Sequence, residues 1–279
     1  MAIEERALAF RCGDDWLYGI ASLPAAAQTH RRGVLIVVGG PQYRVGSHRQ
    51  FTLLARSLAQ DGIAAMRFDY RGMGDSEGLA RPFDMVQDDL RAAIDAFVEA
   101  TPGLHEVVLW GLCDGASAAA MYAASDRRVC GVVLLNPWVR TDNGLARTTL
   151  RHYYRQRLTE RAFWRSLLRG RFNYAGSIKS MLGLVRTALA PAASAGSTLP
   201  DRMLAGMGAF QGRVMVITGG ADLTGREFCD MAAATPQWQQ LLASPRVTQH
   251  CLAGADHTFS RSSWRDQVAA WTSSWVQSW

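Results

Sequence analysis

The feature that most constrains the fold is the regular alternation of short apolar runs with amphipathic segments. Residues 33–38 (GVLIVV) form a continuous apolar run of the kind found in buried strands, and residues 48–62 follow with a helical pattern. The succession repeats with a strand over 63–72, an amphipathic helix over 83–100 and a further apolar run over 107–111. Strand–helix repetition at this spacing predicts an α/β fold with a mostly parallel central sheet flanked by helices.

The alternation stops after Pro137 and resumes at residues 212–220 (GRVMVITGG). Between these points the chain has no strand pattern and is rich in arginine. We therefore expect a core made of residues 1–138 and 206–279, interrupted by an arginine-rich helical cap or lid over residues 139–205. One large domain is compatible with a chain of 279 residues.

The candidate nucleophile is Cys113, in the segment GLCDG (residues 111–115). A G-x-S-x-G elbow places its nucleophile on a sharp strand-to-helix turn, where side chains at the flanking glycines would clash. Here a strand pattern precedes the segment and an alanine-rich helix pattern follows it. The pentapeptide alone is weak, but this context predicts a nucleophile elbow with cysteine in place of serine.

The partners of such a nucleophile follow it in the order acid, then histidine. Asp222 comes directly after the apolar run 212–220, and His257 follows the last predicted strand. We expect a triad in which His257 accepts the thiol proton while Asp222 orients the imidazole. Asp256, next to the histidine, and Asp230, inside a predicted helix, are the competing carboxylates.

The tetrahedral intermediate also requires two backbone N–H donors for its oxyanion. One is expected to be the amide of Asp114, directly after the nucleophile. The other should come from the loop after the first core strand, where Pro41 has no N–H, so either Gly40 or Gln42 must serve, with Gln42 preferred. Gly40 and Trp138 are further candidates for substrate contact, since Trp138 follows a strand end beneath the expected cap.

Several further motifs narrow the resemblance to known proteins. DYRGMGDSEG (69–78) resembles a turn found in the α/β-hydrolase superfamily. GGPQYRVGSHRQF, GLCDGAS, NPWVRT with RHYYRQRL, and LPDRMLAG with DLTGREF resemble the exosortase A system-associated hydrolases of type 1 over nearly the full length. That resemblance implies the α/β-hydrolase fold, a bacterial exopolysaccharide and protein-sorting context, and an acyl thioester or acylated sugar as substrate.

Cysteine at the elbow has a chemical consequence for the substrate. After attack on an alkyl ester, the thiolate leaves more readily than the alkoxide, so the intermediate tends to revert. A thioester, lactone or aryl ester avoids this mismatch. Dienelactone hydrolases and polyester synthases are similar in having this cysteine, and they hydrolyse or transfer acyl groups respectively. The residues predict an acyl hydrolase such as a thioesterase or esterase, with an acyltransferase as the alternative.

The formal charge of +6 is concentrated between Arg140 and Arg171, where nine arginines stand against two acids. Such a stripe is either a solvated helix face or a cationic lid. As a lid it would attract an anionic acyl-CoA, an acyl-carrier protein or a membrane surface, and a non-catalytic membrane-docking scaffold is a third alternative. Without a recognised nucleic-acid-binding module beside the block, we expect no nucleic acid partner.

The five cysteines are widely spaced and contain no C-x-x-C pair, which argues against a disulfide framework or a zinc site. We expect no metal and no cofactor. The N-terminus MAIEERALAF carries acids where a secretion signal needs basic and apolar residues. The longest aliphatic run, residues 34–38, is far below the roughly 20 residues that span a bilayer. These features predict a cytoplasmic protein.

Overall fold

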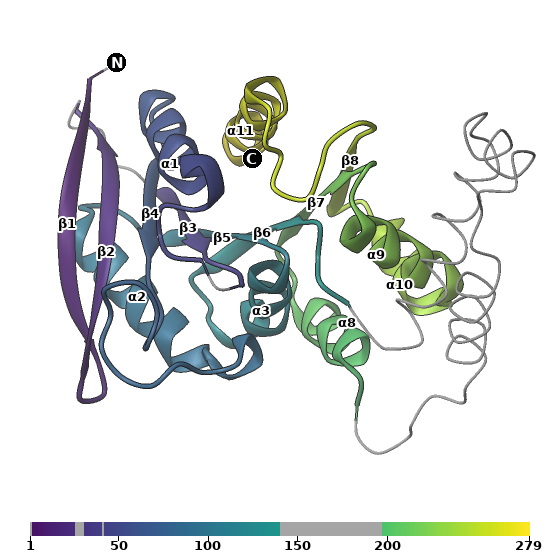
Figure 1. The fold of residues 1–279 in the computed structure, drawn as a ribbon, viewed down its shortest axis with the longest axis horizontal. Helices are drawn as coiled ribbons and strands as arrows, with labels where there is room; N and C mark the ends of the chain where they lie inside the picture. Colours follow the sequence, from purple (N-terminus) through teal and green to yellow (C-terminus); the bar gives the residue numbers. More distant parts are fainter. Residues whose placement is uncertain (1, 26–30, 41, 140–196) are drawn as a thin grey trace, which may run out of the picture.

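The computed structural model describes residues 2–25, 31–40, 42–139 and 197–279. These residues form an eight-stranded sheet in the order β1-β2-β4-β3-β5-β6-β7-β8 (Figure 1). The strands β3 to β8 run parallel, whereas β2 is antiparallel to both β1 and β4. The bounds are β1 (Ile3–Cys12), β2 (Asp15–Pro24), β3 (Arg32–Val37), β4 (Ala64–Phe68), β5 (Glu106–Leu112), β6 (Val129–Leu135), β7 (Arg213–Gly219) and β8 (Val247–Leu252). The predicted, mostly parallel sheet is confirmed.

Helices cover both faces of this sheet. Figure 1 shows α1 (Gln50–Gln60) and α11 (Ser262–Gln277) on one face, and α2 (Gln87–Ala100), α3 (Asp114–Tyr122) and α8 (Leu199–Ala209) on the other. The helices α9 (Leu223–Ala234) and α10 (Pro236–Leu242) lie beside β7 and β8, and short 3-10 turns span Ser47–Arg49, Phe83–Met85 and Ala123–Ser125. Across the described ranges, no helix is long and apolar enough to cross a membrane.

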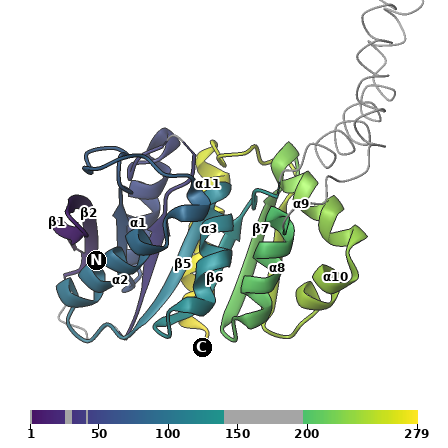
Figure 2. The same ribbon diagram turned by 90° about the horizontal axis from the view of Figure 1, so that it is seen from below.

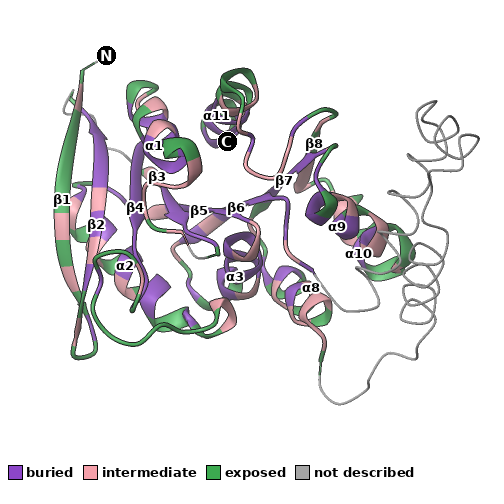
Figure 3. Ribbon diagram, viewed as in Figure 1, coloured by how far each residue is buried: buried purple, intermediate pink, exposed green. Residues whose placement is uncertain are grey.

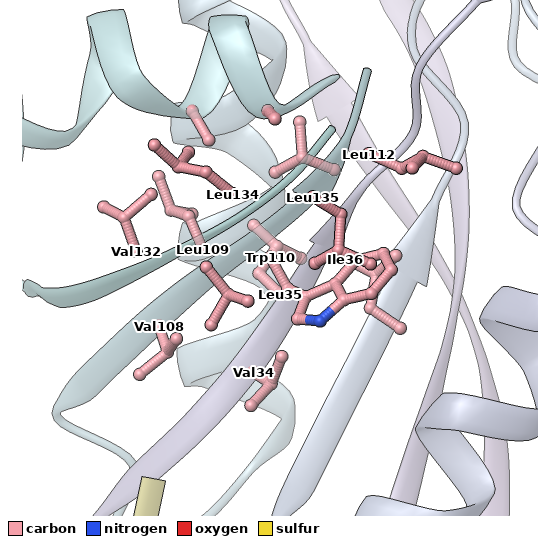
Figure 4. Packing of buried hydrophobic residues seen from close by; sticks show 14 of the residues in the cluster. Val34, Leu35, Ile36, Val108, Leu109, Trp110, Leu112, Val132, Leu134 and Leu135 are labelled. Atoms are coloured by element: carbon pink, nitrogen blue, oxygen red, sulfur yellow. The ribbon is translucent and has the colours of Figure 1, made fainter. Parts of the chain in front are cut away.

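The central strands are buried because helices cover both of their faces, which explains their unbroken apolar runs. Figure 3 shows this burial concentrated in the middle of the sheet, with exposed residues on the outer faces of the helices. In the close view of the core, Ile36 of β3, Trp110 of β5 and Leu135 of β6 lie close to one another on neighbouring strands (Figure 4). Trp110 also packs edge-on against Phe51 at 5.9 Å and donates its indole N–H to Thr272 Oγ1 at 3.3 Å, which joins β5 to both α1 and α11.

Helix α8 crosses the expected junction between residues 205 and 206. It begins with a capping box, in which the side chains of Thr198 and Asp201 bond each other's backbone amides. Its residues Met203 and Met207 are fully buried, and α8 lies beside α3 (Figure 2). The whole of helix α8 is therefore one continuous element that packs beside α3. Residues 140–196, which contain the remainder of the predicted cap and its arginine block, lie outside the described residues.

Candidate active site

Cys113 lies on a sharp turn between the end of β5 and the start of α3. Its backbone angles are φ 61° and ψ −124°, a strained conformation for a residue with a side chain. A Cβ at Gly111 would lie 2.5 Å from the carbonyl group of Gly115, and a Cβ at Gly115 would lie 2.5 Å from the carbonyl oxygen of Val37. Both glycines are therefore required by the turn. The geometry is that of a nucleophile elbow.

Asp222 and His257 meet beside this turn, although they come from different strand ends. Asp222 caps the N-terminus of α9, where its Oδ2 accepts the Gly225 N–H at 2.8 Å, and it is 7% exposed. The same oxygen lies 3.1 Å from His257 Nδ1. The pKa of His257 is raised to about 10. The contact with Asp222 is the largest cause of this rise, and the contact with Cys113 is the second. The structure thus brings together the three residues expected to form the triad.

The competing carboxylate Asp256 is occupied elsewhere. It accepts hydrogen bonds from the backbone N–H of Ser260, at 2.9 Å, and from the Ser260 hydroxyl. These bonds close the turn that follows His257. Asp256 therefore shapes the loop on which the histidine stands, and Asp222 is the carboxylate that faces the imidazole.

Asn136 is a site residue that the sequence analysis did not identify. It follows β6, is fully buried, and has a positive φ of 40°. Its Oδ1 accepts the Gly219 N–H at 2.7 Å, and its Nδ2 donates to the His257 carbonyl oxygen at 3.0 Å. One amide group thereby joins the Asp222 loop to the His257 loop. The only hint in the sequence is an asparagine at the end of an apolar strand, in GVVLLNP.

The expected oxyanion residues lie on both sides of Pro41, which itself is outside the described residues. Gly40 has φ +63° and its N–H is hydrogen-bonded to the Asp114 carboxylate. The side chain of Gln42 accepts the Ser47 N–H at 3.1 Å, and within the described chain its backbone N–H donates to no group. Burial raises the pKa of Asp114, while hydrogen bonds from the amides of Gly40, Gly115 and Asp114 itself oppose that rise.

Arg44 anchors the far end of this loop. Its backbone N–H donates to Asp69 Oδ1 at 2.6 Å, and its guanidinium pairs with the other oxygen of the same buried carboxylate. Asp69 also accepts the Asp75 N–H at 3.2 Å. The carboxylate therefore connects the turn after β4 to the loop that follows β3.

Trp138 lies directly against the elbow. Its backbone N–H donates to the Cys113 carbonyl oxygen at 3.2 Å, and its own carbonyl oxygen accepts the Ser117 hydroxyl at 2.6 Å. The chain leaves the described region two residues later, at position 140.

A separate cavity of about 420 Å³ lies between β7, β8, α9 and α10 and contains none of the three candidate catalytic residues. Its walls are mainly apolar and include Val216, Phe228, Ala232 and Leu242. In the part of the chain that the structure covers, no group of three or more His, Cys, Asp or Glu side chains is placed to hold a metal ion.

Comparison with known proteins identifies the family. A family model described as serine aminopeptidase, S33, matches residues 29–260. The chain belongs to this family of α/β-hydrolases. An esterase of Pyrococcus furiosus has the same fold, with a TM-score of 0.67 and 14% identity over 99% of this chain and 92% of the esterase. The predicted α/β-hydrolase fold is confirmed.

Two curated relatives match this α/β-hydrolase over shorter stretches. The quorum-quenching protein AidA of Acinetobacter baumannii is 32% identical over 94 residues, and the polyketide transferase grgF of a Penicillium species is 33% identical over 91 residues. These matches cover 32% and 31% of this chain and 31% of each relative. The matched family is described by its serine chemistry, whereas the elbow of this chain carries Cys113.

Proposed function

We propose that this α/β-hydrolase is an acyl hydrolase in which Cys113 forms a covalent acyl-enzyme. The observation that carries the proposal is the position of Cys113 on a strand-to-helix turn with a φ of 61°, beside His257, whose pKa is raised first by Asp222 and second by Cys113. The imidazole in turn faces a buried carboxylate, Asp222. A nucleophile, a base and a group that orients the base are the elements of covalent acyl chemistry.

The proposed reaction has two steps. Because Nδ1 of His257 faces Asp222, Nε2 is the nitrogen available to take the Cys113 proton. The thiolate attacks the acyl carbon, the C–S bond forms, and the imidazolium gives its proton to the departing thiol or alcohol. Water then attacks the thioester with His257 as base and releases the acid and the free thiol. The amides of Asp114 and Gln42 are the proposed oxyanion donors in both steps.

The proposed substrate is an activated acyl group, as in a thioester or an aryl ester. A thiolate is a better leaving group than an alkoxide, so an alkyl ester would return to starting material more often than it reacts. An acyl-CoA or acyl-carrier thioester would also suit the cationic stripe from Arg140 to Arg171, which we propose as a docking surface for an anionic substrate or for peripheral membrane contact. The resemblance to exosortase-associated hydrolases suggests exopolysaccharide metabolism, in the bacterial cytoplasm, as the context.

Acyl transfer is the second candidate, and a specific observation favours it. One relative, 33% identical over 91 residues, is named a polyketide transferase. A transferase would use the same acyl-enzyme, with a hydroxyl acceptor in place of water in the second step. The two candidates therefore share the first half-reaction and differ in the second.

Intact-protein mass spectrometry after brief incubation with short and long acyl-CoA and a nitrophenyl ester tests the proposal. We expect a mass increase of one acyl group in the wild type, its loss in Cys113→Ala, and its retention in the matched control Cys251→Ala, whose cysteine is exposed and outside the site. Addition of candidate alcohols to the acyl-enzyme separates transfer from hydrolysis. Unchanged ester turnover by Cys113→Ala would overturn the proposal.

A further inference from the structure

The cavity between β7, β8, α9 and α10 is lined by two cysteine side chains that the proposed reaction does not use. Cys229 of α9 and Cys251 of β8 both border this space of about 420 Å³. Both are free thiols and both are exposed, whereas Cys12 is buried and Cys130 is half-buried. Solvent therefore reaches two thiols at one place on the molecule.

The strand wall of the cavity presents Cys251 to α9. In the parallel register of β7 and β8, Cys251 is paired with Thr218, and both residues line the cavity. Successive side chains of a strand point to opposite faces of the sheet. The ring of His250 accordingly stacks on Trp271 of α11, with the ring centroids 4.2 Å apart. Cys251 therefore points to the face of the sheet that α9 and α10 cover.

The helical wall that carries Cys229 is joined to the neighbouring helix and strand. Phe228, the residue before Cys229, packs edge-on against Trp238 of α10, with ring centroids 5.5 Å apart. The side-chain amide of Gln249 in β8 donates to the Leu242 carbonyl oxygen at the end of α10, at 3.1 Å. The two cysteines thus stand on walls that side-chain contacts hold together around one cavity.

The electrostatic surroundings of Cys229 agree with this placement. Desolvation by the surrounding side chains raises the pKa of the Cys229 thiol, Thr218 opposes that rise, and the charge of Cys251 adds to it. Thr218 and Cys251 are the residues paired across β7 and β8. The groups that act on Cys229 are therefore those that the strand register places on the opposite wall.

Two neighbouring thiols without a further ligand favour disulfide chemistry over metal binding. In the part of the chain that the structure covers, no third His, Cys, Asp or Glu side chain joins them to form a metal-binding group. A thiolate that forms a mixed disulfide with an external compound is released when a second protein thiolate attacks it. In a reducing compartment, disulfides formed in this way are usually transient and respond to oxidants.

We propose that Cys229 and Cys251 form a dithiol site that reacts with low-molecular-weight disulfides and closes to a Cys229–Cys251 disulfide at the cavity. One thiolate attacks a sulfur of the external disulfide RSSR, forms a mixed disulfide and expels RS⁻. The second thiolate attacks the protein sulfur of that mixed disulfide, forms the internal S–S bond and expels a second RS⁻. The protein loses two electrons and its two thiol protons, and one RSSR is reduced to two RSH.

The bridge would join two elements that lead to the candidate catalytic residues. Asp222 caps the N-terminus of α9, and His257 lies in the loop that follows β8. A disulfide between α9 and β8 also closes a loop in the unfolded chain, so the oxidised protein should be more stable than the reduced protein. Cys113 takes no part in this exchange, and the inference is independent of the proposed acyl chemistry.

The test is carried out on the full chain with Cys113→Ala, so that the candidate nucleophile does not react, and with oxidised glutathione as the disulfide. The two cysteines fall in separate tryptic peptides, residues 227–246 and 247–261. Mass spectrometry without reductant should find these peptides joined by a disulfide and should find them separate after dithiothreitol. We expect the bridged product to exceed the mixed disulfide by at least about tenfold, because the second thiol attacks from within the same molecule.

Single substitutions in the same background separate the two steps. Cys229→Ser and Cys251→Ser should each stop at a mixed disulfide, with a mass increase of one glutathione. Cys130→Ser is the matched control, since Cys130 does not line the cavity, and this variant should form the bridge at the rate of the parent. The bridged form should melt about 5–10 °C above the reduced form, and neither single variant at the cavity should show this shift.

Stable mixed disulfides on both cysteines without a bridge would overturn the proposal. So would bridges from Cys229 or Cys251 to Cys12 or Cys130, and so would two thiols that stay unmodified in the folded protein. The measurement detects a disulfide in a variant that lacks Cys113. Failure of the acyl-enzyme hypothesis would therefore leave this result unchanged, and the two failures are distinguishable.

Discussion

The elbow at Cys113 and the two loops that carry Asp222 and His257 are held in place by different means. The elbow is made of five successive residues, in which Gly111 allows a close contact with Gly115, and Gly115 a close contact with the carbonyl oxygen of Val37 in β3. The loops depend on Asn136, which lies 83 positions from Gly219 and 121 positions from His257. Close backbone packing therefore aims the nucleophile, whereas the side-chain hydrogen bonds of Asn136, together with the bond from the Ala221 N–H to the Ala255 carbonyl oxygen, align the base and its carboxylate.

The largest effect should come from Asp222→Asn, which disrupts the contact between the two loops that carry Asp222 and His257. Without the carboxylate, the histidine loses the contact that contributes most to its raised pKa of about 10. We expect kcat to fall by about 10³- to 10⁴-fold and the pKa of His257 to move toward its ordinary value near 6.5. Steady-state kinetics and NMR titration of the imidazole proton measure the two changes, and an unshifted pKa would contradict the assignment of Asp222.

The same substitution has a signed effect on the pH dependence of stability. Because the folded-state pKa of His257 is raised above the unfolded value, its stabilisation is fully present below about pH 6.5 and is lost as the pH rises through about 10. Urea unfolding should therefore show the greatest difference between wild type and Asp222→Asn in mildly acidic buffer, and convergence above pH 10.

Gly115→Ala, which adds a Cβ inside the elbow turn, should have the next largest effect. The added Cβ would meet the backbone oxygen of Val37, which cannot move without shifting β3. We expect a loss of about 1–3 kcal/mol in unfolding free energy, together with slower acylation. Gly208→Ala, on the exposed side of α8 with no atom within 4 Å, is the control and should stabilise by about 0.5–1 kcal/mol. Equal stability of the two variants would show that the turn is more tolerant than its contacts indicate.

Asn136→Gly sharpens the comparison because it removes the long-range link without straining the backbone. Glycine tolerates the φ of 40°, so the change isolates the two side-chain hydrogen bonds. We expect about 1–3 kcal/mol lower stability and acylation slowed about tenfold, with iodoacetamide alkylation of Cys113 less affected. If alkylation falls as much as acylation, the elbow and the loops are not independent.

Cys113→Ser is expected to give the smallest change, read as a ratio of two activities. Serine keeps the elbow and the contact with His257 but alters the match between nucleophile and leaving group. Thioester turnover should fall more than nitrophenyl ester turnover, by about tenfold in the ratio. The two activities are measured on one preparation, so protein concentration cancels. An equal loss on both substrates would contradict the argument from leaving groups.

Prediction from the sequence succeeded where the determining residues are close together in the chain. Apolar runs such as residues 33–38 had to become strands covered on both faces, because only burial satisfies them. The elbow could be located because its glycines and its nucleophile lie within five residues. The extent of helix α8 across the expected junction at residues 205 and 206 could not be predicted, since the burial of Met203 and Met207 beside α3 is a tertiary contact with no local pattern.

The amino-acid sequence by itself determined the strand and helix order, the elbow at Cys113 and the succession of Cys113, Asp222 and His257. Only the tertiary structure decided that Asp222 rather than Asp256 faces the imidazole and that Asn136 links the two loops. The physical reason is that a hydrogen bond between residues far apart in the chain is selected by the packing of the whole sheet. A pattern of hydrophobicity records which residues are buried, but it does not record which buried polar groups meet.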